Sequence, residues 1–288
     1  FGITKEMTTK MKIIALLSFP AAICASISPR TRSAAFLSDS ALLVRGGDLG
    51  PISGEALAKT FGVLAIGDAI GGSVSSTAEV YEKFHITVLP GSNGEHYLGH
   101  GIASSASQLA VTSLLALTGT TSVEEAVGFG MLARSAYMTE MLLTGKYKDL
   151  GVPTVPHILV YMLLLGTAFG LLSGSSDGVT LAKIVSVILA GHGSLLFLNP
   201  RIDEDDDTKQ MAKVDGAYMF VSSLFSALLA FGVDPVKAMG YTAIGCLPLF
   251  VTFVGLVADD AKMFGLNSEQ WTFIAVLFIG SSAFGMLT

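Results

Sequence analysis

Long apolar segments alternate with short polar breaks from residue 57 to the end of the chain. Each segment approaches the ~20 apolar residues that an α-helix needs to cross a bilayer. The segments cover residues 57–75, 98–118, 123–144, 155–174, 180–198, 212–232, 235–257 and 270–287. The breaks carry helix-ending residues, for example Asn199-Pro200 and Asp234-Pro235. This pattern predicts an all-α membrane protein with about eight transmembrane helices.

The apolar segments also resemble one another in pairs. LAKTFGVLAIGDAI at 57–70 shares its first three letters and its apolar pattern with LAKIVSVILAGHGS at 181–194. Further along, VTSLLA at 111–116 resembles VSSLFS at 221–226. Because the matches occur in the same order in both halves, they predict an internal repeat.

The predicted repeat divides the membrane region into residues 57–174 and 181–288, each with four helices. A unit of four spans returns the chain to the side on which it started, so both units would enter the membrane in the same direction. We therefore expect two parallel four-helix repeats about an axis along the membrane normal. This paired layout resembles that of DoxX-like small membrane proteins, although no motif supports transferring their functional residues to this chain.

Composition agrees with a membrane protein. Hydrophobic residues make up 51% of the chain and charged residues 14%, whereas about 25% of the residues of an average soluble domain are charged. The formal net charge of −6 argues against a nucleic-acid partner, which would need a basic surface. The expected partners are the lipid bilayer and other membrane-protein subunits.

Residues 1–35 have the composition of a targeting presequence. The apolar run IIALLSFPAAICAS has the length of a signal-peptide core, and SISPRTRSAAFLS then combines serine and arginine without acidic residues. Ser33-Ala34-Ala35-Phe36 resembles the Ala-Ser-Ala-Phe motif of bipartite presequences in algae with secondary red plastids, with Ala34 where the motif has serine. The resemblance implies a plastid membrane. The alternative is a secretory signal and a secretory-pathway membrane, and residues 36–56 are expected to be flexible in either case.

Ionisable residues within apolar segments are candidate functional residues, because a charge at membrane depth is energetically unfavourable. The repeat places Asp68 and His192 at equivalent positions, so the two side chains could face each other across a two-fold axis. In the alternative interpretation, Asp68 lies at a glycine-rich helix end and His192 forms a hydrogen bond with a backbone carbonyl.

Arg134 and Glu140 lie within the segment 123–144. Six residues apart, they do not share a helix face, so each is expected to need a partner on another helix. A structural ion pair between helices is the favoured interpretation, and a proton or anion path is the alternative.

The segment 78–101 contains the densest group of potential ligands. His96 and His100 are four residues apart and would share one face of a helix. With His192 they are candidate ligands for a pigment, so chlorophyll or carotenoid is the cofactor considered. No complete metal-binding motif is present, no metal site is predicted, and an amphipathic interfacial helix is the favoured interpretation.

No catalytic motif is recognisable elsewhere. The acidic run RIDEDDDTKQ at 201–210 lacks the ligand spacing of an EF-hand and is interpreted as a solvated loop. Phosphate-binding and serine-hydrolase motifs are absent from the sequence. The favoured function is therefore not enzymatic: a carrier or channel-like module with a path between the two bundles. The alternative is a pigment-binding or assembly subunit of a photosynthetic membrane complex. A third interpretation, a membrane oxidoreductase or lipid-modifying enzyme, would need a clustered histidine or carboxylate site, which only residues 79–100 offer.

Overall fold

The computed structural model describes residues 53–74, 101–149, 153–199, 206–258 and 268–288. Within these ranges all regular secondary structure is helical, which confirms the predicted all-α class. The helices are α3 (Gly54–Val74), α6 (Ala103–Thr118), α7 (Val123–Leu143), α8 (Lys146–Asp149), α9 (Thr154–Leu172), α10 (Ser176–Leu198), α11 (Asp206–Ala230), α12 (Pro235–Ala258) and α13 (Ser268–Leu287).

Each predicted apolar segment coincides with one long helix, with its ends shifted by a few residues. The main difference is the start of α11. The prediction that the acidic run is a loop is wrong for residues 206–210, which form the first turn of α11. Asp206 and Asp207 begin this helix, where unpaired backbone N–H groups and the helix dipole favour negative charge.

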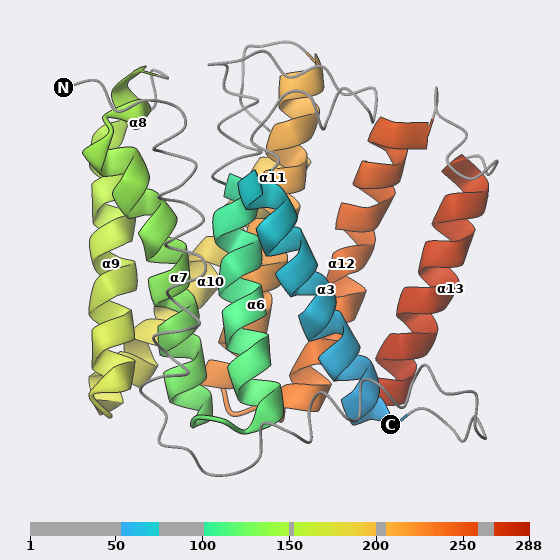
Figure 1. Cartoon of the computed structure of the whole chain (residues 1–288), viewed down its shortest axis with the longest axis horizontal. Coiled ribbons are helices and arrows are strands. Elements are labelled where there is room, and N and C mark those ends of the chain that lie inside the picture. The colour runs from blue at the N-terminus through green and yellow to red at the C-terminus, as the bar shows by residue number, and fades with distance from the viewer. Residues whose placement is uncertain (1–52, 75–100, 150–152, 200–205, 259–267) are drawn as a thin grey trace.

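The long helices form one bundle in which consecutive helices run in opposite directions (Figure 1). α6 and α11 contact each other in the interior. α3 packs on α6 and α10 packs on α11, while α7 lies between α6 and α9, and α12 lies between α11 and α13. Contacts of α9 with α10, and of α13 with α3, complete the arrangement.

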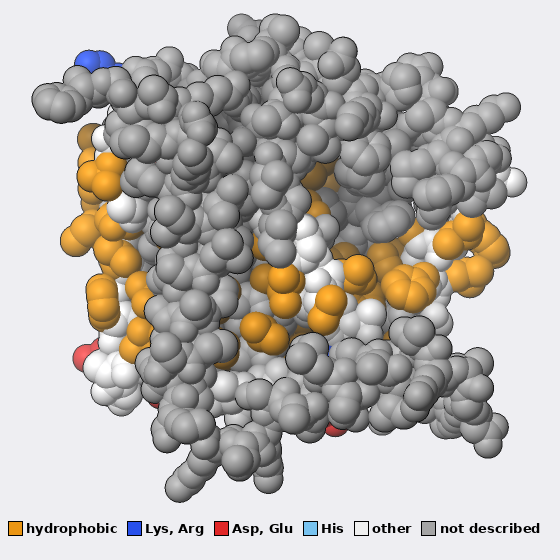
Figure 2. Space-filling model, in the orientation of Figure 1, with side chains coloured by type: hydrophobic (Ala, Val, Ile, Leu, Met, Phe, Trp, Pro, Cys, Tyr) orange, Lys and Arg blue, Asp and Glu red, His pale blue; other side chains and the backbone are white. Residues whose placement is uncertain are grey.

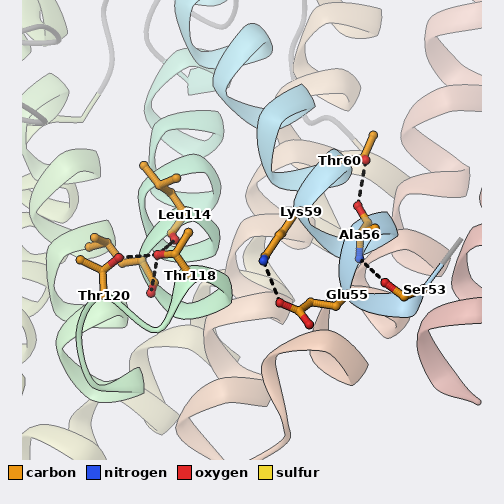
Figure 3. Close-up of polar contacts among 9 residues, drawn as sticks. Ser53, Glu55, Ala56, Lys59, Thr60, Leu114, Thr118 and Thr120 are labelled. Atoms are coloured by element: carbon orange, nitrogen blue, oxygen red, sulfur yellow. Dashed lines mark hydrogen bonds and ion pairs between the residues drawn. The ribbon is translucent and has the colours of Figure 1, made fainter. Parts of the chain in front are cut away.

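Local sequence signals explain where the helices begin. Ser53 accepts a hydrogen bond from the Ala56 N–H group at 3.2 Å, and Glu55 pairs with Lys59 at 2.7 Å in the first turns of α3 (Figure 3). α7 starts with a capping box, in which the Ser122 side chain accepts from the Glu125 N–H group and the Glu125 carboxylate accepts from the Ser122 N–H group.

Glycine allows α10 and α11 to approach each other closely. A Cβ atom on Gly193 would lie 2.6 Å from the backbone oxygen of Gly216, and one on Gly216 would lie 2.7 Å from the oxygen of Gly193. Both distances are far below the ~3.5–4.0 Å at which carbon atoms pack favourably. Neither position therefore has room for a side chain while the two backbones keep their contact.

Large hydrophobic side chains cover the outer faces of several helices. In Figure 2 they follow the left and right margins, where Figure 1 places α9 and α13, and the few visible charged side chains lie toward the upper and lower ends. Of the described helices, α9 and α10 are long and apolar enough to cross a bilayer, and Thr272–Leu287 is a shorter apolar stretch. The exposed hydrophobic residues of these helices include Ile158, Leu159, Met162, Ile184, Ile188, Leu195, Phe273, Leu277 and Phe278.

Two glycines on α10 provide a direct test of this packing. Gly193→Ala is expected to lower the free energy of unfolding by about 1–3 kcal/mol, because the new methyl group must separate two backbones. Gly191→Ala, two residues away with open space around it, is expected to raise stability by up to about 1 kcal/mol through better helix propensity. Thermal unfolding of both variants in the same detergent measures the difference. Equal transition temperatures would contradict the close approach at Gly193.

Candidate functional site

A line of buried polar side chains runs between α6, α7 and α11. On α6 and on α11 these residues recur at spacings that place them on one face of each helix. None of them is more than 4% exposed. We call this set the polar seam: Ser105, Gln108 and Thr112 of α6, Arg134 of α7, and Asp215, Ser222 and Ser226 of α11.

Gln108 connects the three helices through hydrogen bonds. Arg134 Nη1 donates to Gln108 Oε1 at 3.0 Å, and Gln108 Nε2 donates to Ser226 Oγ at 3.0 Å. Ser226 Oγ donates in turn to the Ser222 backbone oxygen, one helical turn back along α11. Since the amide uses both its acceptor and its donor, these bonds determine its orientation. The chain of bonds joins residues of the first predicted repeat to residues of the second.

Two glycines next to the polar seam leave space for its side chains, because glycine has no Cβ atom. A Cβ atom on Gly101, just before α6, would overlap Cγ and both oxygens of the Asp215 carboxyl group. A Cβ atom on Gly130 of α7 would overlap the Thr112 hydroxyl group and lie 3.0 Å from the Gln108 backbone oxygen. Glycine is therefore required at both positions if Asp215 and Thr112 are to keep their places.

Several polar atoms of the seam lack hydrogen bonds. Within the described part of the chain, Asp215 Oδ1, Ser105 Oγ and Thr112 Oγ1 are buried without a hydrogen-bond partner. A buried polar atom without a partner is energetically unfavourable, so native structures usually satisfy it with a bound water molecule or a ligand. These atoms indicate where water or a small polar solute would be stabilised.

The two charged residues of the polar seam interact with each other and with a neighbouring phenol group. Arg134 and Asp215 interact electrostatically with each other and with Tyr147 of α8. Burial raises the pKa of Tyr147 to about 12, Arg134 opposes this shift and Asp215 adds to it, so the phenol remains protonated at neutral pH. The Tyr147 ring packs on His157 with their centroids 4.4 Å apart.

The candidate functional residues predicted from the sequence do not lie together in the structure. Arg134 lies in the polar seam, and its hydrogen-bond partner is a neutral amide on α6. Glu140 lies on the same helix, half-buried, toward the end that leads to α8. The His192 side chain is exposed on α10, outside the polar seam. Asp68 belongs to α3, but its side chain lies outside the described part of the structure.

His96 and His100 also lie outside the described residues. Within the described ranges, no group of three or more His, Cys, Asp or Glu side chains is placed to hold a metal ion.

Sequence reasoning missed Gln108, Asp215 and Ser226. Asp215 could have been found by the criterion that selected Arg134, since it is a charged residue inside the predicted segment 212–232. Gln108 and Ser226 are neutral, and such residues are common in membrane helices. Their importance becomes visible only when the helices are packed together.

The fold and the polar seam thus define, among the described residues, an all-helical bundle with large apolar side chains on its outer faces and a set of polar side chains buried within an apolar interior. Comparison with protein-family models, with curated proteins and with solved structures finds no match for this chain.

Replacing Gln108 tests the hydrogen-bond network. Gln108→Leu keeps the approximate volume but removes the acceptor of Arg134 and the donor to Ser226. We expect the free energy of unfolding to fall by about 3 kcal/mol, because a buried guanidinium loses its acceptor. Chemical denaturation in detergent measures the loss.

Ser107→Ala is the matched control on the same helix, since it removes one neutral hydrogen bond, from Ser107 Oγ to the Tyr137 hydroxyl group at 3.2 Å. This variant is expected to lose about 1 kcal/mol. A Gln108→Leu variant that is as stable as Ser107→Ala would show that Arg134 does not depend on Gln108.

Proposed function

We propose that the protein is an integral membrane protein with a carrier or channel-like role, and that its path follows the polar seam between two four-helix bundles. The bundles correspond to residues 57–174 and 181–288, arranged as parallel repeats with about eight spans in total. The plastid address of residues 1–35 is part of the proposal, although those residues lie outside the described structure.

The distribution of side chains supports membrane insertion. Leu159 of α9 is 60% exposed and Phe278 of α13 is 50% exposed, while Arg134 and Asp215 are each 4% exposed. A surface with large apolar residues and an interior with charges suits a lipid environment, where charged residues face the inside of the bundle. Serine, alanine and glycine at the helix contacts are typical of helices that pack in a bilayer.

The pattern of helix contacts supports two related bundles. The α3–α6, α6–α7 and α7–α9 contacts of the first bundle have counterparts in α10–α11, α11–α12 and α12–α13 of the second. The links between bundles also form a pair, since α9 contacts α10 and α13 contacts α3. In this arrangement α6 and α11 are equivalent helices, and they meet at the boundary between the bundles.

The observation that carries the proposal is the set of unsatisfied polar atoms at that boundary. Ser105, Thr112 and Asp215 each present a buried polar atom without a hydrogen-bond partner among the residues that the structure describes. In membrane proteins, polar residues inside the bundle mark the routes of ions and solutes, and transporter sites lie at the interface of structural repeats. The α6–α11 interface combines both features.

Cysteine accessibility tests the path. In a background in which Cys24 and Cys246 are replaced by alanine, Ser105→Cys and Thr112→Cys are expected to react with a small hydrophilic methanethiosulfonate reagent in intact proteoliposomes. The reaction is expected because the polar seam would hold water that admits the reagent. Mass spectrometry of the intact chain measures the modified fraction.

Ala110→Cys is the matched control, because Ala110 is buried on the face of α6 opposite the polar seam. It is expected to remain unmodified. Equal reactivity of Ser105→Cys and Ala110→Cys would refute a hydrated path.

The position of His192 favours a second candidate function, the binding of a pigment. This imidazole is exposed among the outward-facing side chains Ile188 and Leu195 of α10, which are 55% and 67% exposed. A single histidine in an apolar surface can serve as the axial ligand of a chlorophyll held from the lipid side or by a neighbouring subunit.

An absorption spectrum of the tagged protein, purified in mild detergent from its native membranes, tests this candidate. Pigment binding predicts chlorophyll or carotenoid bands in stoichiometric amounts, and the chlorophyll bands should fall in His192→Leu because the axial ligand is lost. Ile188→Leu, a change on the same exposed face, is expected to leave the bands unchanged. A colourless wild-type protein would eliminate the candidate.

A further inference from the structure

We infer that the polar seam conducts protons and that Asp215 takes up and releases each proton on the way; this inference rests on the membrane path proposed above. Within the described part of the seam, Asp215 is the one carboxylate. Its side chain is 4% exposed, and its Oδ1 atom has no hydrogen-bond partner in the described ranges. A carboxylate oxygen that accepts no hydrogen bond can take up a proton without breaking one.

Arg134 determines which ions could pass. The guanidinium is held in the seam by Gln108 and carries a permanent positive charge. A fixed cation beside a narrow path repels metal cations such as K⁺. A proton is different, because it moves by binding to the carboxylate next to that charge and to water and hydroxyl groups in turn.

The hydroxyl groups of the seam provide further steps. Ser105 and Thr112 follow Asp215 along the interface, and their hydroxyl oxygens have no partner among the described residues. A hydroxyl group can donate and accept at once, so it can take part in a hydrogen-bonded chain with water. Ser226 extends this line to the Gln108 amide.

Among the described residues, charged and titratable groups near Asp215 come from the helices packed around it. Arg134 of α7 and Tyr147 of α8 act on it electrostatically, and Glu140 lies further along α7. The sequence of α6, residues 103–118, contains no ionisable side chain. On α10 the nearby ionisable residue is His192, whose side chain is exposed, and on α12 residues 242–258 contain none except Cys246.

Asp215 itself lies on α11, where Lys209 and Lys213 are half-buried toward the start of the helix. Protonation of Asp215 would change the electrostatic environment of Arg134 and Tyr147, the groups with which it interacts.

The proton transfer is balanced without any other reactant. A proton from water on one side forms an O–H bond with the Asp215 carboxylate, which becomes a neutral acid. That bond then breaks as the proton passes to a water or hydroxyl oxygen on the other side, and the carboxylate is restored. No group is oxidised or reduced.

Proton flux into proteoliposomes that contain the full chain and the dye pyranine tests the inference. A K⁺ gradient with valinomycin sets the membrane potential. The wild-type chain should acidify the lumen when the lumen is negative and make it alkaline when the lumen is positive. Asp215→Asn should lower the initial rate about 10²-fold, because the amide cannot carry the proton. Asp215→Glu should retain part of the rate.

Asp177→Asn is the matched control, since Asp177 is an exposed carboxylate in the first turn of α10. It should conduct like the wild type. An Asp215→Asn rate equal to that of the control would overturn the inference.

Wild-type measurements keep the test decisive even if Asp215→Asn does not fold. A wild-type rate no higher than that of protein-free liposomes would overturn proton conduction, while reactive Ser105→Cys would leave the hydrated path intact. An unreactive Ser105→Cys would instead remove the path on which the inference rests. A K⁺ flux as fast as the proton flux, measured without valinomycin, would contradict the role of Arg134.

Discussion

A guanidinium group can be buried only where an acceptor meets it, and this requirement constrains how α6, α7 and α11 pack. Arg134 reaches its acceptor on Gln108 because Gly130 lets α7 approach α6 closely. The same amide then donates to Ser226, and this bond fixes the position of α11 along the axis of α6. Loss of the Gln108 acceptor would leave the buried guanidinium without this hydrogen bond, at a cost of about 3 kcal/mol. The three helices therefore depend on one another's position.

Small and polar residues at several helix contacts accompany an apolar core that includes Leu164, Phe225 and Met239. The contact of Gly193 with Gly216 brings two backbones together, and dispersion between closely packed helices then provides the attraction. In lipid this is the main source of helix association, because apolar side chains gain little by leaving an apolar solvent. The exposed leucine, isoleucine and phenylalanine side chains of α9, α10 and α13 suit the same environment.

The helices could be predicted well from the sequence, but only part of the candidate site could, and there is a physical reason for this contrast. The length of an apolar segment is a local property, so the long helices could be located from it. The start of α11 was misplaced because Asp206 and Asp207 suit a helix N-terminus as well as a loop. Arg134 was recognised because a charge in an apolar segment stands out, whereas Gln108 has no such signal. Its role depends on which side chains three different helices bring to one point.

The proposed repeat also explains why the polar seam draws on both halves of the chain. At the shared offset, Arg134 of the first unit corresponds to Ile244 of the second, and Asp215 of the second corresponds to Ser105 of the first. Ile244 is 46% exposed, so the second unit has an apolar surface residue where the first has a buried cation. One unit thus contributes the guanidinium and the amide, and the other contributes the carboxylate and a hydroxyl acceptor. Because α6 and α11, which the proposed repeat makes equivalent, contact each other in the interior, these unlike groups lie along one interface, and Arg134 and Asp215 interact electrostatically across it.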